Sequence, residues 1–180
     1  MNKWKTGLLF LASASWITAN NASLAACSTN IIGTAPDSRF AVNQNGTILD
    51  KATGLMWKQC AEGQSTTSVT CIPGTASKYT WQEALRLVET LNSNGGFAGY
   101  TDWRLPNRNE LASLVERKCA NPAINQNIFP GTDSADYWSS SPVAQDANRA
   151  WSVDFFYGKV VPQFKSSNYG FSVRLVRDAK

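Results

Sequence analysis

A chain of 180 residues with 43% hydrophobic residues is long enough for one domain with a buried core, and its composition is far from that of a disordered protein. The formal charge of +4 falls to +2 over residues 27–180, which keep 15 of the 17 Lys and Arg and all 13 acidic residues; without any basic run, this argues against a nucleic-acid partner. The chain has no histidine, which excludes His-based triads, Cys–His dyads and His-ligated metals.

Residues 1–26 have the pattern of an export signal. Lys3 and Lys5 precede a mostly apolar stretch from Gly7 to Ala19, and small residues follow it. This stretch is too short and too interrupted to predict a transmembrane helix, and no later segment reaches the length of one. We therefore expect an exported domain, in the periplasm, on the cell surface or secreted, with no transmembrane segment.

Two processing routes fit the end of this leader. Cleavage after Ala25 by ordinary signal peptidase would leave a chain that begins at Ala26. The sequence Leu24-Ala25-Ala26-Cys27 also resembles a bacterial lipobox, in which Cys27 would carry a lipid anchor. The first route leaves four cysteines available for pairing, whereas the second leaves three.

The even cysteine count favours two disulfides in an exported domain. Cys60 and Cys71 form the natural short-range pair, because they enclose a polar loop. Cys27 and Cys119 would then tie the N-terminal arm, residues 27–45, to the end of the central helix. A zinc site is disfavoured because paired C-x-x-C spacings are absent, and we expect no metal and no cofactor.

The first elements of the domain, which we place at residues 46–178, form a hairpin and a helix. Asn45-Gly46 predicts a turn before strands at 47–50 and 55–58. Thr80 and Glu83 form a capping box that starts a helix. Asn94-Gly95-Gly96 ends it, because glycine adopts left-handed backbone conformations easily.

The central stretch, residues 99–111, predicts a strand that turns directly into a second helix. Alternation at 102–105 indicates the strand, which Pro106 must end. Asn107 and Glu110 provide a second capping box, and helical spacing continues to Leu114 and Val115. We expect Trp103 to lie in the core and Arg104 to pair with a carboxylate.

Short strands dominate the remainder of the chain. Strand patterns occur at 137–140, 150–156, 159–164 and 171–176. Two helices followed by hairpin-linked strands predict an α+β fold, with the helices packed on short antiparallel strands and disulfides stapling them.

Six motifs occur in an order that closely resembles the Lcl C-terminal domain family, named after the terminal domain of a bacterial collagen-like adhesin. They run from about Phe40 to Arg177: Thr53-Gly54-Leu55-Met56-Trp57-Lys58, Thr80-Trp81 with Ala84-Leu85, Gly99-Tyr100-Thr101-Asp102-Trp103-Arg104-Leu105-Pro106-Asn107 with Glu110-Leu111, Tyr137-Trp138-Ser139-Ser140-Ser141, Ala150-Trp151-Ser152-Val153-Asp154-Phe155 and Val173-Arg174-Leu175-Val176-Arg177. The resemblance implies a C-type-lectin-like fold, distantly similar to the formylglycine-generating, sulfatase-modifying domain.

The resemblance also implies a type of ligand. The adhesin's domain binds sulfated polysaccharides, so a sulfated or acidic polysaccharide is the expected partner. This chain lacks the collagen-like Gly-x-y tract of the adhesin. It also has no cysteine after Cys119, whereas the sulfatase modifiers use a cysteine pair and copper near the end of the domain, so their oxidase activity is not expected here.

Aromatic and cationic residues near the later strands are the candidate ligand-binding set, because aromatic faces stack on sugars and cations hold acidic groups. The candidates are Tyr137, Trp138, Arg149, Phe156, Tyr157, Lys159 and Tyr169. Strand alternation places Trp151, Val153 and Phe155 on one face, which we expect to be buried, and Ser152, Asp154 and Phe156 on the other.

Three functions remain open on this sequence. The first is an exported, adhesin-like module that binds polyanionic or carbohydrate ligands. The second is an enzyme distantly like the sulfatase modifiers that uses tyrosine or carboxylates such as Asp102 with Glu110. The third is a structural or protein-interaction domain. Asp102, Asp133, Asp136 and Asp154 have calcium-type oxygens, but their spacing fits no calcium loop, and we expect them to be solvated turn residues.

Overall fold

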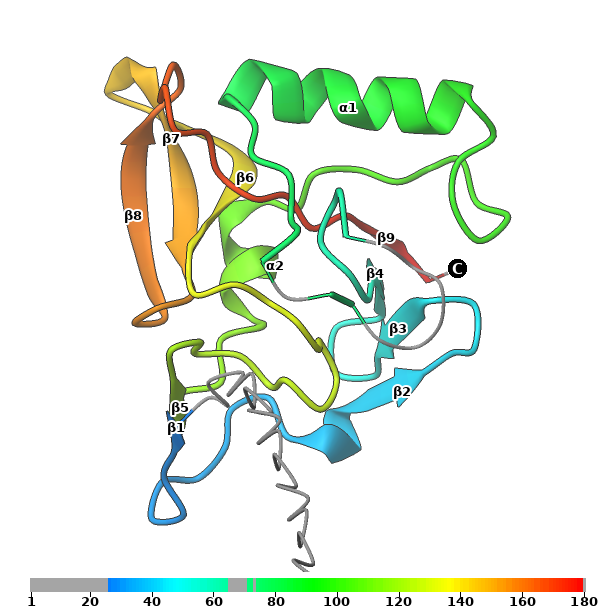
Figure 1. The fold of residues 1–180 in the computed structure, drawn as a ribbon, viewed down its shortest axis with the longest axis vertical. Helices are drawn as coiled ribbons and strands as arrows, with labels where there is room; N and C mark the ends of the chain where they lie inside the picture. The colour runs from blue at the N-terminus through cyan, green and yellow to red at the C-terminus, as the bar shows by residue number, and fades with distance from the viewer. Residues whose placement is uncertain (1–25, 65–70, 73, 180) are drawn as a thin grey trace, which may run out of the picture.

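The computed structural model describes residues 26–64, 71–72 and 74–179 (Figure 1). Within this part of the chain the fold is α+β, with two α-helices and antiparallel sheets, as the sequence predicts. Nearly all of the expected export signal lies outside the described residues, and so does most of the loop between Cys60 and Cys71.

One sheet has the strand order β2-β3-β4-β9. Its strands are β2 (Phe40–Val42), β3 (Thr47–Asp50), β4 (Leu55–Lys58) and β9 (Val176–Asp178), and every neighbouring pair is antiparallel. The predicted hairpin at 47–50 and 55–58 is confirmed. The N-terminal arm adds a short 3-10 helix, η1 (Asp37–Arg39), and the edge strand β2.

The second sheet has the order β6-β7-β8 and is drawn on the left of Figure 1. Its strands are β6 (Asp136–Val143), β7 (Asp146–Asp154) and β8 (Lys159–Phe164). Gly158, at φ 70°, lies in the turn between β7 and β8. A Cβ atom there would lie 2.6 Å from Val115 Cγ1, so the turn packs closely on the 115–123 segment.

The predicted strand at 171–176 is wrong in its extent. Within residues 171–178, regular pairing starts only at Val176, where β9 joins β4. Before that point, Phe171 bridges to Tyr79 and Ser172 bridges to Tyr137. The segment passes from one sheet to the other and changes partners on the way, so its alternating pattern does not become one ladder.

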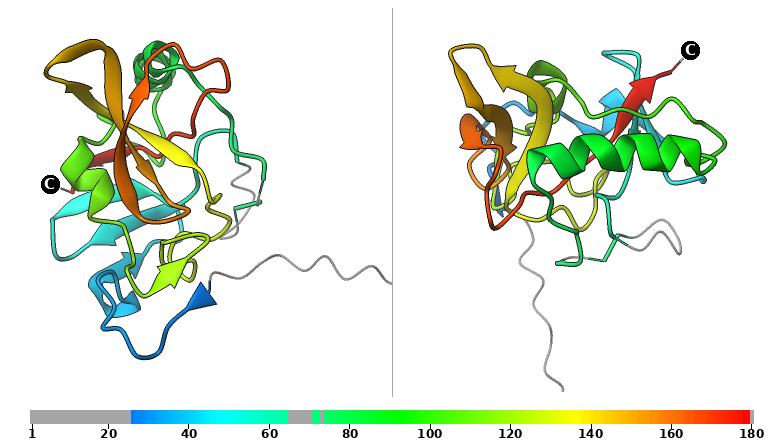
Figure 2. Two further views of the ribbon diagram at one scale, coloured as in Figure 1. Left: turned by 90° about the vertical axis from the view of Figure 1, so that its left-hand side faces the viewer. Right: turned by 90° about the horizontal axis from the view of Figure 1, so that it is seen from above.

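Helix α1 (Trp81–Ser93) begins with the predicted capping box, in which Thr80 and Glu83 exchange hydrogen bonds. It ends at a glycine turn: the Gly96 N–H donates to the Leu91 carbonyl, and Gly96 has φ 72°. A Cβ atom at Gly96 would lie 1.8 Å from the Tyr100 carbonyl oxygen. Figure 2 shows α1 lying across one end of the molecule; its apolar side packs on Trp103, Trp138 and Leu175.

The central stretch, residues 99–111, turns into its helix around one carboxylate. Glu110, in helix α2 (Arg108–Ala112), accepts hydrogen bonds from the Asn107 N–H at 2.8 Å and from both terminal nitrogens of Arg104 at 2.7 and 2.9 Å. Trp103 is buried. The predicted roles of Trp103 and Arg104 are therefore confirmed.

Two details of this corner differ from the prediction. The helix ends at Ala112: the Ser113 N–H still bonds four residues back, but the N–H groups of Leu114 and Val115 bond three residues back. The expected strand at 102–105 makes a single bridge, from Arg104 to Val176.

Both predicted disulfides are present. Cys60 bonds to Cys71, and Cys27 bonds to Cys119. The second joins two short paired strands, β1 (Ala26–Cys27) and β5 (Cys119–Ala120). Since the Cys27 sulfur is used in this bond, it is not available for a lipid thioether in this structure. Among the described residues, no helix has the length and apolar character needed to cross a membrane.

Candidate functional site

The β7–β8 hairpin presents aromatic and cationic side chains on one face of its sheet. Arg149 lies directly opposite Phe164, and Trp151 lies opposite Pro162. Directly opposed residues of an antiparallel pair share a face, and so do residues two apart on one strand. These four residues therefore lie together, and Phe164 has 54% of its surface exposed.

An arginine stacks on each of the two aromatic rings. The Arg149 guanidinium lies 4.2 Å from the Phe164 ring centroid, and the Arg108 guanidinium lies 5.1 Å from that of Trp151. Arg108 comes from α2, which is held to the sheet by a hydrogen bond from the Arg108 N–H to Ser141 Oγ at 3.1 Å. We call Arg108, Arg149, Trp151 and Phe164 the arginine–aromatic patch.

A hollow of about 370 Å³ opens beside this patch, between α2 and the turn that joins β6 to β7. It is lined by Arg108, Ser141, Pro142, Val143, Ala144, Gln145 and Trp151. One carboxylate lies close to the patch: Asp146 Oδ2 is 3.3 Å from Arg149 Nε, and both side chains are more than one-third exposed. An exposed pair of this kind is weak, so Arg149 can exchange it for an acidic group of a ligand.

The chemistry of the patch suits acidic, ring-shaped ligands. A guanidinium binds carboxylate or sulfate-like oxygens through two parallel N–H groups while its flat face stays on an aromatic ring. The partly exposed Trp151 and Phe164 rings offer apolar faces for a sugar ring. The patch can therefore bind by charge and by stacking at the same point.

Two of the predicted ligand residues, Tyr137 and Trp138, do not reach the surface. Both are fully buried. The Trp138 indole N–H donates to the Tyr79 carbonyl at 2.8 Å, and burial raises the pKa of the Tyr137 hydroxyl. Their assignment to the ligand surface has to be corrected, because both are core side chains on opposite faces of β6. Trp138 packs in the cluster beneath helix α1, and Tyr137 packs in the other core cluster, edge-to-face on Phe155 with ring centroids 5.1 Å apart.

The other five predicted residues lie in three places. Arg149 belongs to the arginine–aromatic patch. Phe156, Tyr157 and Lys159 lie at the β7–β8 turn, where the Lys159 Nζ is 5.0 Å from the Tyr157 ring centroid. Tyr169, which is 89% exposed, follows β8 and belongs to neither group.

Sequence reasoning missed Arg108, Trp151 and Phe164 as surface residues. Val153 and Phe155 are fully buried, as expected, but Trp151 is only partly covered. Along β7 the apolar core includes Val153 but does not extend to Trp151. The Trp151 ring is covered by Arg108 instead of by an apolar side chain. The alternation of Val160, Pro162 and Phe164 was the available signal for an aromatic outer face on β8.

The acidic residues considered for calcium or for catalysis are engaged separately. Asp102 pairs with Arg177 at 2.7 Å, and this guanidinium holds the pKa of Asp102 below its ordinary value. Asp136 accepts from Ser152 Oγ at 2.8 Å, and Asp154 accepts from the Phe156 N–H at 2.7 Å. Within the described ranges, no group of three or more His, Cys, Asp or Glu could hold a metal ion.

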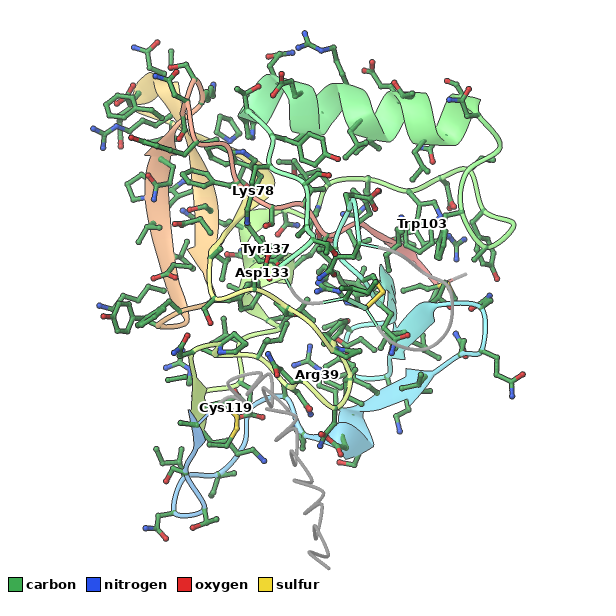
Figure 3. The ribbon with its side chains drawn as sticks, in the orientation of Figure 1. Arg39, Lys78, Trp103, Cys119, Asp133 and Tyr137 are labelled. Carbon is green, nitrogen blue, oxygen red and sulfur yellow. A yellow bond between two sulfur atoms is a disulfide. The ribbon has the colours of Figure 1, made fainter. Side chains whose placement is uncertain are left out.

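A polar cluster around Lys78 is the strongest alternative site. Lys78 Nζ donates to Ser172 Oγ at 2.7 Å and lies 3.7 Å from Asp133 Oδ2. Figure 3 shows Lys78, Asp133 and Tyr137 near the middle of the molecule. Ser172 is fully buried, so within this cluster its hydroxyl is covered, and the contacts of Lys78 link the segment that carries Ser172 to the segment that carries Asp133.

Three other hollows have less suitable linings. One of about 720 Å³ contains Asp50 and Asp178, which are already paired with Arg39 and Arg104. One of about 320 Å³ is lined mainly by acids and amides beside the Cys27–Cys119 disulfide. A third, of about 410 Å³, places Glu83 beside Arg86. The arginine–aromatic patch therefore remains the best candidate, although its hollow is not the largest of these.

Comparison with known proteins supports the family resemblance that the motifs along the chain indicate. No curated protein matches this sequence. The scan against protein families matches residues 46–177 to the Lcl C-terminal domain, which is most of the chain. The protein therefore belongs to the Lcl C-terminal domain family.

Proposed function

We propose that this protein is an exported binding module that holds an acidic carbohydrate on its arginine–aromatic patch. The observation that carries the proposal is the pairing of each exposed ring with a guanidinium on one face of the hairpin, Arg149 on Phe164 and Arg108 on Trp151. Charge and an apolar ring face at one point suit an acidic sugar better than they suit a small apolar ligand.

Export is supported by the cysteine chemistry. All four cysteines form disulfides, and such bonds persist mainly in oxidising compartments outside the cytosol. The proposal includes an adhesin-like role and a C-type-lectin-like assignment of the fold, which the two helices on short antiparallel strands support.

Catalysis is less well supported. Asp102 and Glu110, the carboxylates considered as an acid pair, are bound to Arg177 and to Arg104 respectively. The hydrogen bond from Arg177 lowers the pKa of Asp102, so this carboxylate is a poor proton donor at neutral pH. The Lys78–Ser172 contact is closed to solvent on the serine side. A carboxylate- or tyrosine-based enzyme therefore stays the less favoured alternative.

Elution from immobilised heparin tests the proposal. The variant Arg108→Gln/Arg149→Gln should elute at clearly lower salt than the wild type, because both guanidiniums leave the patch while the fold is retained. The matched control Lys51→Gln/Arg86→Gln removes the same charge from exposed positions elsewhere and should elute close to the wild type. Dextran sulfate should compete for binding and neutral dextran should not.

Equal elution of the patch variant and the control would contradict the patch as the site. Failure of the wild type to bind heparin at low salt would contradict an acidic carbohydrate as the ligand. If the patch instead docks another protein, binding of that protein should be lost in Phe164→Ser. Moderate salt should leave such apolar binding intact.

A further inference from the structure

A short loop of the N-terminal arm exposes two adjacent isoleucines. The loop, residues 28–33, follows β1, and within it Ile31 is 51% and Ile32 is 92% exposed. Isoleucine is among the residues most often fully buried, as Ile48 and Ile124 are in this protein. Figures 1 and 2 show the loop, in blue, projecting beyond β1 and β5 at one end of the molecule. We call residues 28–33 the isoleucine loop.

Both ends of the isoleucine loop are fixed to the anchoring segment, which is the stretch between α2 and β5. At the start of the loop, the Ser28 N–H donates to the Lys118 carbonyl at 2.7 Å. Just after the loop, Thr34 Oγ1 donates to the Val115 carbonyl at 2.7 Å and accepts from the Arg117 N–H at 2.9 Å. Because the loop is held at both ends, its tip is kept away from the core, and the exposure of its isoleucines is a property of the fold.

The anchoring segment directs its cations outward and its carboxylate inward. Arg117 is exposed and Lys118 is half-buried, and neither forms an ion pair within the described part of the chain. Glu116, between them, is fully buried and accepts backbone N–H groups. The nearby Asp37 is exposed, but two asparagine amides bind its carboxylate. Toward solvent, the anchoring segment is therefore positively charged.

We infer that the isoleucine loop is a membrane contact, which inserts Ile31 and Ile32 into the interface of a bilayer and brings the cations of the anchoring segment to anionic lipid headgroups. Burial of apolar side chains at the boundary of headgroups and acyl chains, together with attraction of cations to anionic lipids, drives binding at such an interface. The contact uses none of the residues of the arginine–aromatic patch, so it does not depend on the proposed carbohydrate ligand.

The shape of the loop favours a lipid surface over a folded protein partner. A stable protein interface buries about 800 Å² on each partner and needs matching shapes, and two side chains at the tip of a short loop supply much less. A fluid bilayer adapts to a convex tip. The predicted export signal also joins the described chain at Ala26, in β1 beside the loop, so export itself would bring this end of the domain to a membrane.

Co-sedimentation with lipid vesicles tests the inference. The wild type should sediment with phosphatidylcholine vesicles that contain about 30% phosphatidylglycerol, and more weakly with phosphatidylcholine alone. The isoleucine variant Ile31→Ser/Ile32→Ser should bind the anionic vesicles about tenfold more weakly, because both apolar side chains are lost from the interface. The matched control Val42→Ser/Ile72→Ser removes two exposed aliphatic side chains from other places and should bind like the wild type.

Two further variants separate this contact from the proposed carbohydrate site. Arg117→Gln/Lys118→Gln should weaken binding to the anionic vesicles and change binding to phosphatidylcholine alone much less. The isoleucine variant should elute from heparin as the wild type does, which also checks that it is folded. The patch variant Arg108→Gln/Arg149→Gln should retain most of its vesicle binding.

Three results would overturn the membrane contact and leave the proposed function standing. The first is equal binding of the isoleucine variant and the wild type to anionic vesicles. The second is a wild type that stays in the supernatant with both kinds of vesicle. The third is a wild-type dimer in solution that binds no vesicles and that the isoleucine variant abolishes, since a second copy of the chain would then be the partner of the loop.

Discussion

At the scale of single residues, exposure separates the aromatic side chains that build the core from those that can meet a ligand. Tyr137, Trp138 and Phe155 are fully buried, whereas Tyr157 and Phe164 are mostly exposed. All of them belong to strands or to the turn between strands, so their chemistry alone does not distinguish them. Residue type predicted a sugar-binding surface in this region. Only the burial of each side chain shows whether it belongs to the core or to the surface.

Arg174 is the least expected residue of the interior. It is fully buried, and its guanidinium donates to Thr132 Oγ1 at 2.8 Å, to the Lys58 carbonyl at 3.0 Å and to the Gln59 carbonyl. Burial lowers its pKa. The ring of Phe129, 4.9 Å away, covers one of its faces. One side chain thereby links the end of β4, the segment before β6 and the chain that leads to β9.

We expect Arg174→Met to lower the free energy of unfolding by about 3 kcal/mol or more, because it leaves two buried carbonyls and a hydroxyl without their donor. Urea unfolding with the disulfides intact measures this change. Arg86→Met on the exposed side of α1 is the control and should differ little from the wild type. Equal free energies of unfolding for the two variants would show that the hydrogen bonds of Arg174 do not stabilise the core.

At the scale of elements, one buried carboxylate fastens the N-terminal arm. Glu116 accepts hydrogen bonds from the N–H groups of Thr34 and Ala35 at 2.9 Å each and from that of Lys118 at 3.1 Å. Burial acts to raise its pKa, but these backbone donors and the Lys118 charge outweigh burial and lower the pKa below its ordinary value of 4.5. Gly33 passes so close that a Cβ atom would lie 2.9 Å from the carboxylate.

The hydrogen bonds to Glu116 should make the stability of the fold around the N-terminal arm sensitive to acid. Because the folded-state pKa of Glu116 is depressed, its stabilisation is present above the unfolded-state value and is lost as the pH falls through the folded-state value. Glu116→Gln should therefore be less stable than the wild type at pH 7, and the gap should narrow as the pH is lowered from about 4.5.

Urea unfolding across this pH range measures the gap. Other carboxylates with lowered pKa values, such as Asp50, are present in both proteins and cancel in the difference. Glu89→Gln, on the exposed side of α1, should follow the wild type throughout. A gap that stays constant with pH would contradict a role for the charged form of Glu116.

At the scale of the whole molecule, the two disulfides act over different lengths of chain. Cys60–Cys71 spans a separation of 11 residues, and Cys27–Cys119 spans 92. The longer bridge joins the arm to the segment after α2, and the 2-residue strands β1 and β5 are the local pairing beside it. The fold around this bridge therefore depends on a long-range covalent link.

Loss of the longer bridge should cost more stability. In the loop-entropy description, Cys27→Ser/Cys119→Ser lowers the free energy of unfolding by about 4–5 kcal/mol, against about 3 kcal/mol for Cys60→Ser/Cys71→Ser. Chemical unfolding of the two double variants measures the difference, and intact mass before and after reduction checks the pairing. The opposite order of stabilities, or a thiol at Cys27 that reacts without reduction, would contradict this account.

The sequence by itself determined the features that depend on neighbouring residues. The capping boxes at Thr80 and Asn107 and the 47–58 hairpin arise from local hydrogen bonds and turn geometry, so local pattern was sufficient to predict them. The two cystine pairs were also predicted, because an even count favoured full pairing and the short separation of Cys60 and Cys71 left Cys27 to pair with Cys119.

Only the tertiary structure decided which groups distant in sequence come together. Arg108 meets Trp151 across α2 and β7, and Arg174 reaches carbonyls at 58 and 59. The late start of β9 has the same cause, because Phe171 and Ser172 pair with Tyr79 and Tyr137 before the chain reaches β4. Whether an aromatic ring on a strand is buried depends on what covers that strand, and residue alternation along a single strand carries no record of it.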